Sequence, residues 1–253
     1  MRSVQSVWTA AKNAIIEAWR IEYKYSRYQK NNTFSGIHST PDCWQKLDNE
    51  SAQLMIFVNH AYNASQGLFD ITSGILREAW TFNGNDKLPL QNQIDALLPY
   101  VGWKKLTWST EAPEQLKMPL GMELDFGGIG KEYAVDKVLT ICCQTLASNS
   151  AAILVNCGGD LACSGVRLNG ESWKVGIESI SRHNKAQQII ALSSGALATS
   201  GDSKRFLLKD GIRIKPNHWL AHYRRTEKYH CRRSNLHQRR HHRYTRPITQ
   251  KAS

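Results

Sequence analysis

The 253-residue sequence lacks long hydrophobic runs, any Cys-x-x-Cys motif and any Pro- or Ser-rich linker. Its longest apolar stretches, such as residues 151–155 and 189–192, are far shorter than the roughly 20 residues of a membrane-spanning helix. No signal peptide is visible, so we expect the chain as written to stay in the cytoplasm. Without a Cys-x-x-Cys pair, the six cysteines favour reduced core thiols over a disulfide framework.

Acidic residues are scarce at the C-terminal end. Residues 214–253 contain 11 Lys and Arg against one acid, Glu227, and they hold six of the nine histidines. The preceding residues contain 22 Lys and Arg against 20 acids, so the body is nearly neutral and gives no electrostatic reason to expect a polyanion partner. We expect one folded domain over residues 1–213 and a basic, disordered tail over residues 214–253.

Two binding functions remain open for this tail. Its arginines alternate with tyrosines, as in segments that hold DNA, RNA or an anionic membrane. Cys231, His237 and His241 offer zinc ligands, but no second cysteine pair accompanies them. We expect neither a specific nucleic-acid partner nor a zinc site.

Periodicity predicts a mixed α/β or α+β fold. Val4, Trp8, Ala11 and Ile15 recur at helical spacing, which predicts a helix that runs toward Tyr23. A loop is expected over residues 25–37, and Thr40 and Pro41 resemble the start of a second helix that Gly67 ends. The further predicted elements are helices at residues 75–80, 94–98 and 131–147 and strands at 103–108, 122–126, 151–156, 161–165, 173–177, 188–192 and 206–208.

The stretch "ELDFGGIGKEYAVDKV" is the most informative one. A predicted strand delivers Asp125, glycines allow a tight turn, and Lys131 opens a helix whose free N–H groups favour phosphate. The nucleotide-binding templates do not fit, since Glu132 replaces the Walker hydroxyl and Tyr133 the third glycine of a dinucleotide fingerprint. Phosphate binding and a structural strand-to-helix turn both remain open.

Three other turns are rich in Gly, Asp or Ser. "VNCGGDLACSG" carries Asp160, "ALATSGDSKRF" carries Thr199 and Asp202, and "GLFDITSG" carries Phe69 and Asp70. Each can be an ordinary turn, and in the last one a buried Phe and a helix-capping Asp would suffice. Together the turns can also converge on one polar ligand.

Five motifs in this order resemble FAD:protein FMN transferases of the ApbE type. They are "YSRYQKNNTFSGIH", "GLFDITSG", "LDFGGIGKEYAVD", "LVNCGGDLACSG" and "ATSGDSKRF", and the likeness covers roughly residues 15 to 213. The resemblance implies a single α+β domain around a flavin-binding cleft. It also implies a magnesium-dependent enzyme that splits FAD at its pyrophosphate, links FMN through a phosphoester to a Thr or Ser of a target flavoprotein, and releases AMP.

The resemblance also assigns site residues. The residues placed against FAD are Tyr28, Leu68, Phe69, Asp70, Asp125 and Lys131. Of these, Asp125 and Lys131 would hold the polar parts of FAD, and the backbone carbonyl of Gly128 would bind magnesium. Asp160, Thr199 and Asp202 would shape the pocket.

The sequence departs from this family at both ends. Members begin with a strand before the first helix, so we expect this N-terminus to be truncated. After Arg213 the family's Ser-His motif, its remaining metal ligands and its C-terminal layer are missing. In a shifted reading frame, residues 215–231 can encode "NPTTGWPITDAPKSITV", which resembles the missing continuation, so we hypothesise a frameshift. We therefore expect an impaired or inactive enzyme, and the alternative is an FAD-binding protein without transferase activity.

Overall fold

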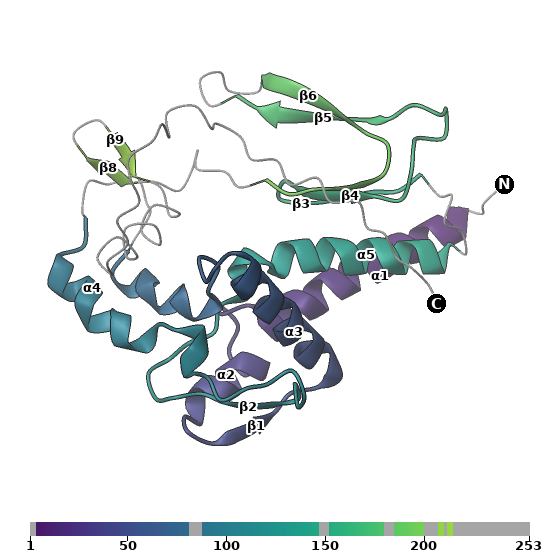
Figure 1. Ribbon diagram of the computed structural model, residues 1–253. Helices are drawn as coiled ribbons and strands as arrows, with labels where there is room; N and C mark the ends of the chain where they lie inside the picture. Colours follow the sequence, from purple (N-terminus) through teal and green to yellow (C-terminus); the bar gives the residue numbers. More distant parts are fainter. Residues whose placement is uncertain are drawn as a thin grey trace. The chain divides into compact units, whose positions relative to one another are not determined.

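The computed structural model describes residues 4–80, 88–146, 152–179, 185–199, 207–209 and 212–214 (Figure 1). They form helices and small antiparallel sheets, which confirms the predicted α+β class. Among them, no helix is long and apolar enough to cross a membrane. The chain divides into two compact units, here called the α5 unit (Met1–Glu22, Ile129–Ser200 and Arg233–Ser253) and the α3 unit (Tyr23–Gly128 and Gly201–Arg232).

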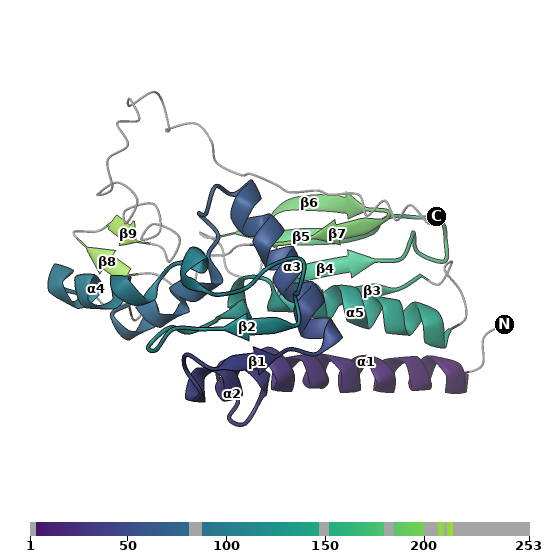
Figure 2. The same ribbon diagram turned by 60° about the horizontal axis from the view of Figure 1, so that its bottom comes forward.

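Two long helices form one layer of the α5 unit. Helix α1 (Val4–Tyr25) belongs to this unit as far as Glu22, and it lies beside α5 (Gly130–Thr145) in both views (Figures 1 and 2). Asn13 Nδ2 donates a hydrogen bond of 3.2 Å to Thr145 Oγ1 between them. Both helices were predicted within one or two residues of these bounds.

A small sheet supplies the second layer of the α5 unit. The strands β3 (Leu154–Cys157), β4 (Asp160–Cys163) and β7 (Gly195–Leu197) pair antiparallel in the order β3-β4-β7, and α5 packs on β3 and β4. All four residues of β4 are buried. A separate hairpin joins β5 (Trp173–Glu178) to β6 (Ala186–Leu192). Each of these strands except β7 was predicted from its apolar pattern.

The apolar stripe that predicts α1 faces solvent. Val4, Trp8 and Ile15 are 74%, 72% and 52% exposed, whereas the buried side of this helix is formed by Ala10 and Ile21. Helical spacing therefore identified the helix, but Ala10 and Ile21 on the other side make its packing contacts.

The α3 unit is built from short elements. They are α2 (Thr33–Ser39), β1 (Trp44–Lys46), α3 (Asn49–Ala64), η1 (Ile71–Glu78), α4 (Gln91–Leu97), η2 (Leu98–Tyr100), η3 (Trp103–Lys105), β2 (Gln115–Lys117), η4 (Phe126–Gly128), β8 (Leu207–Lys209) and β9 (Ile212–Ile214), where η marks a 3-10 helix. β1 pairs antiparallel with β2, and β8 with β9. Tyr25, Phe34 and Phe126 form a buried aromatic cluster, in which the Phe34 and Phe126 ring centroids lie 4.5 Å apart.

The second helix begins later than predicted, and the expected loop before it contains a helix. Asp48, not Thr40, caps α3 by accepting a hydrogen bond from Ser51 N, because residues 44–46 pair with β2 instead. Within the expected loop, Asn32 and Ser35 form a reciprocal capping box that starts α2.

Two predicted strands were wrong. Trp103–Lys105 is a 3-10 turn, and only Thr107 behind it makes an isolated bridge, to Lys117. Residues 122–126 form no strand, because their backbone groups form hydrogen bonds with separate elements and not with one neighbouring strand. Leu124 N donates a hydrogen bond to His38 Nε2, and Asp125 N donates one to Ile71 O.

Candidate functional site

Asp125 lies at a close-packed turn of the α3 unit. Its Oδ1 accepts a hydrogen bond of 2.8 Å from Gly127 N, and its backbone N donates to Ile71 O at 2.8 Å. Its Cβ would lie only 2.4 Å from a Cβ on Gly74, so that position admits no larger residue without movement. The carboxylate is therefore held by its own turn and by the η1 segment.

Arg27 links two of the residues predicted to contact FAD. Its Nη1 forms an ion pair with Asp125 Oδ2, and the two side chains are only 23% and 19% exposed. Its Nη2 donates a hydrogen bond of 2.9 Å to the hydroxyl of Tyr28, and the guanidinium carbon lies 5.0 Å from that ring's centroid. Sequence reasoning missed Arg27, although its place beside Tyr28 in "SRY" was a signal for it.

The "GLFDITSG" motif divides into an exposed part and a structural part. Leu68 is 50% exposed and Phe69 is half-buried. Asp70 caps η1: its Oδ1 accepts from Thr72 N and Thr72 Oγ1 at 2.9 and 2.7 Å, and its Oδ2 accepts from Trp103 N at 3.0 Å. Asp70 therefore caps η1, one of the two roles considered for it from the sequence.

Gly128 lies against Phe69 at the end of η4. A Cβ at Gly128 would approach Phe69 Cε2 to 3.2 Å, so the glycine permits this close contact. Magnesium takes about six oxygen ligands in octahedral geometry. Within the described ranges, no group of three or more His, Cys, Asp or Glu side chains is placed to hold a metal. The carbonyl of Gly128 by itself does not make a magnesium site.

Lys131 belongs to the α5 unit, where it forms a second cluster. Its Nζ lies 2.6 Å from Asp160 Oδ2, and the carboxylate is 2% exposed whereas the lysine side chain is 53% exposed. Asp160 Oδ1 accepts a hydrogen bond of 2.9 Å from Thr199 N. The structure therefore brings Lys131, Asp160 and Thr199 together, while Asp202 lies outside the described residues.

The negative charge of Asp160 affects two neighbouring groups. Burial, with a contribution from Asp160, raises the pKa of Glu132, whose Oε2 is buried without a hydrogen-bond partner in the described part of the chain. Burial and then Asp160 also raise the pKa of the Cys157 thiol. In both groups burial is the larger cause of the raised pKa, and Asp160 adds to it.

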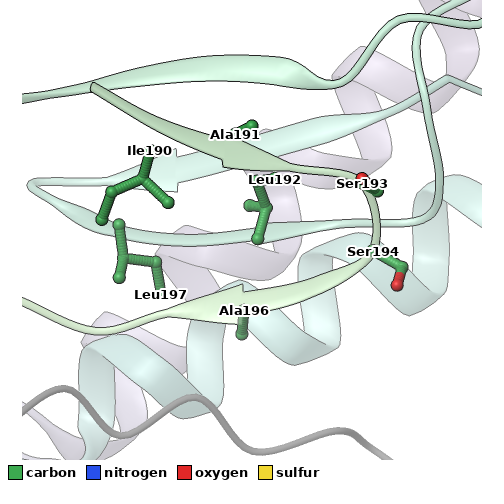
Figure 3. A pocket seen from close by; sticks show the side chains of 7 residues that line it. All are labelled: Ile190, Ala191, Leu192, Ser193, Ser194, Ala196 and Leu197. Carbon is green, nitrogen blue, oxygen red and sulfur yellow. The ribbon is translucent and has the colours of Figure 1, made fainter.

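An apolar cavity lies elsewhere in the α5 unit. It measures about 300 Å³ and occupies the turn between β6 and β7 (Figure 3). Its lining residues are Ile190, Ala191, Leu192, Ser193, Ser194, Ala196 and Leu197. This lining contains no ionisable side chain, so the cavity has no group to neutralise a phosphate.

The structure thus combines an α+β fold with carboxylate–cation pairs beside glycine-rich turns. The sequence model described as the ApbE family matches residues 2–222. The chain belongs to this family.

Named relatives agree with this membership. The chain is 27% identical to the FAD:protein FMN transferase of Chlamydia pneumoniae over 185 residues. The aligned part covers 72% of this chain and 56% of that protein. It is 31% identical over 157 residues to that of Salmonella typhimurium strain LT2, or 59% and 44% of the two chains. The crystal structure of the ApbE protein from Thermotoga maritima superposes with a TM-score of 0.73 at 29% identity, covering 84% of this chain and 69% of that one. The chain spans about half the length of the curated relatives it matches.

Proposed function

We propose that this chain carries the FAD-binding part of a flavin transferase. The proposed reaction is the magnesium-dependent transfer of FMN from FAD to a Thr or Ser of a target flavoprotein, through a phosphoester and with release of AMP. Membership of the ApbE family and the similarity to named FAD:protein FMN transferases support the reaction class. The acceptor protein is defined only by the hydroxyl group that it must present.

The observation that carries the proposal is the Arg27–Asp125 pair. The guanidinium of Arg27 offsets the charge of Asp125 in a site with little exposure, so that the carboxylate can hold polar parts of FAD without repelling its pyrophosphate. The neighbouring rings of Tyr28 and Phe69 offer the flat apolar faces that a flavin ring can stack on. We assign FAD contacts to Tyr28, Leu68, Phe69, Asp70 and Asp125.

Lys131 is assigned to FAD on the family resemblance. Its ammonium is more than half exposed and has further hydrogen-bond donors besides the one used by Asp160. Phosphoryl transfer depends mainly on positioning and on neutralising charge, which a lysine provides as a point charge.

Magnesium enters this proposal through the backbone carbonyl of Gly128. When bound, the ion would neutralise charge on the pyrophosphate. Because the described residues supply no side-chain ligand set beside Gly128, we propose that the chain retains FAD binding and has little transferase activity. An FAD-binding protein without transferase activity is the limiting case of this proposal. The basic tail, where polyanion or zinc binding was considered, lies outside the described residues.

FAD titration of purified variants tests the binding site. We expect Asp125→Ala and Lys131→Ala each to weaken FAD binding by about tenfold or more, the size expected for one charge-assisted contact. Glu123→Gln is the matched control, because Glu123 forms another carboxylate–arginine pair, with Arg77, in the α3 unit. Unchanged affinity in the Asp125 or Lys131 variants would remove that residue from the site.

A second assay separates binding from transfer. Release of AMP and covalent FMN on a Thr-containing acceptor are measured with and without added magnesium and with a chelator. Binding without AMP release identifies the non-transferring alternative, and transfer at a normal rate would contradict the expected impairment.

A further inference from the structure

Asp160 is a buried carboxylate at the start of strand β4. The two residues before it, Gly158 and Gly159, have φ values of 64° and 102°, which makes the tight turn from β3 into β4. A Cβ on Gly159 would come within 2.5 Å of Thr199 Oγ1, so Thr199, the second residue after β7, packs directly against this turn. The side chain of Asp160 is consequently shielded from solvent on a rigid strand end.

The partners of this carboxylate come from two other elements. Oδ2 pairs with Lys131 Nζ at the first turn of α5, and Oδ1 accepts from Thr199 N behind β7. Thr199 Oγ1 in turn donates a hydrogen bond of 2.9 Å to Gly159 O. A buried carboxylate is costly unless it is paired and hydrogen-bonded, and here both oxygens are engaged.

The exposure of the pair is strongly unequal. Asp160 is 2% exposed and Lys131 is 53% exposed, so the buried partner fixes a cation that still faces solvent. A free lysine has many rotamers, and a ligand that binds it must immobilise them; a lysine already tethered at 2.6 Å has lost much of this freedom. The Lys131 ammonium is therefore preorganised.

We propose that Asp160 is a positioning residue that holds the Lys131 ammonium for the pyrophosphate of FAD. This inference rests on the proposed function and adds a residue that acts through Lys131 rather than by touching the ligand. It assigns to Asp160 a role in affinity that goes beyond shaping a pocket. Thr199 acts one step further away, by keeping the carboxylate in place.

A double-mutant cycle tests whether Asp160 acts through Lys131. Asp160→Asn keeps the size of the side chain and an acceptor for Thr199 N but removes the charge. We expect Asp160→Asn and Lys131→Met each to raise the dissociation constant for FAD about tenfold, and the double variant to bind about as weakly as Lys131→Met alone. A purely structural role for Asp160 would instead make the two effects multiply.

Two further variants guard against misfolding and general charge effects. Asp160→Glu keeps the charge but displaces it by one methylene group, and we expect it to weaken FAD binding while far-UV circular dichroism is unchanged. Glu171→Gln is the matched control, because Glu171 pairs with Arg167 at 3.4 Å on the surface of the α5 unit. We expect that variant to bind FAD like the parent chain.

The outcomes distinguish this inference from the proposed function. FAD binding that is unaffected in folded Asp160→Asn, or multiplicative effects in the cycle, overturns the role of Asp160 and leaves the proposed function standing. A parent chain that binds FAD but releases no AMP is the non-transferring case of the proposed function and leaves the Asp160 inference intact. A parent chain that binds no FAD overturns both.

Discussion

The Arg27–Asp125 and Lys131–Asp160 pairs differ in which partner is exposed. In the α3 unit, Arg27 and Asp125 are both largely buried, at 23% and 19% exposure. In the α5 unit, the side chain of Asp160 is 2% exposed, whereas that of Lys131 is 53% exposed. The first pair thus neutralises itself inside the protein, whereas the second directs a cation outward.

The backbones that carry these pairs also differ. Asp125 stands in irregular chain directly before the 3-10 helix η4, and its surroundings are fixed by single hydrogen bonds and by an aromatic cluster. Asp160 stands in a regular antiparallel sheet whose register fixes it. Regular pairing spreads the constraint over many bonds, while the Asp125 region depends on a few side chains, so the two regions should respond differently to substitution.

The largest effect is expected where the Asp125 region meets the aromatic cluster. Phe126, directly after Asp125, is 2% exposed and packs on Phe34 and Tyr25. We expect Phe126→Ala to lower the free energy of unfolding by about 3–5 kcal/mol, measured from urea midpoints at constant slope. Trp44→Ala, at a 59% exposed aromatic side chain in the same unit, should cost less than about 1 kcal/mol. Equal losses in the two variants would show that the cluster is not what anchors the region.

The same difference between regular and irregular backbone explains which elements could be predicted from the sequence. The apolar patterns of α5, β3 and β4 predicted these elements and placed Lys131 and Asp160 on neighbouring motifs, because their structure follows local periodicity. The strand predicted at residues 122–126 was wrong, since the bonds of Leu124 and Asp125 go to His38 and Ile71, far away in the chain. No local pattern encodes such tertiary contacts.

Among the candidate site residues, motifs predicted individual positions but not their partners. Asp125 and Tyr28 were predicted from separate motifs. Only the structure shows that Arg27 contacts both of them, through an ion pair with Asp125 and a hydrogen bond to Tyr28. Asp70 was correctly considered as a helix cap, because an Asp before an apolar turn is a local signal. The burial of Asp160 could not be inferred, since the Gly-Gly-Asp sequence of a turn does not specify whether its carboxylate is buried.

A smaller effect is expected from His38, which supports the backbone beside Asp125. Its Nε2 accepts a hydrogen bond of 3.0 Å from Leu124 N, and burial lowers its pKa, with Arg77 acting in the same direction and Glu123 and Asp125 opposing. Because the folded state binds the proton less readily than the unfolded state, this contribution is complete above about pH 6.5 and is lost as the pH falls from there through the lowered folded pKa.

Urea unfolding of the parent chain and His38→Gln at pH 7.5 and pH 5.5 measures this contribution. Glutamine can still accept the hydrogen bond from Leu124 N but does not titrate in this range. We expect the parent's midpoint to fall more than that of His38→Gln between the two pH values. Identical falls would mean that His38 does not couple protonation to folding.

The smallest effect on the free energy of unfolding is expected at the exposed apolar stripe of α1. This stripe belongs to the α5 unit and, unlike the aromatic cluster of the α3 unit, it is not buried. Trp19 is 68% exposed, so its removal takes little apolar area out of a packed environment. We expect Trp19→Gln to change the free energy of unfolding by no more than about 0.5 kcal/mol. On the opposite face, Ala10 is 4% exposed, and Ala10→Gln should destabilise the unit by burying a polar side chain, by about 1–3 kcal/mol. If Trp19→Gln proved the more damaging of the two, the face of α1 that packs would be the apolar stripe, and the arrangement of α1 against α5 would have to be reversed.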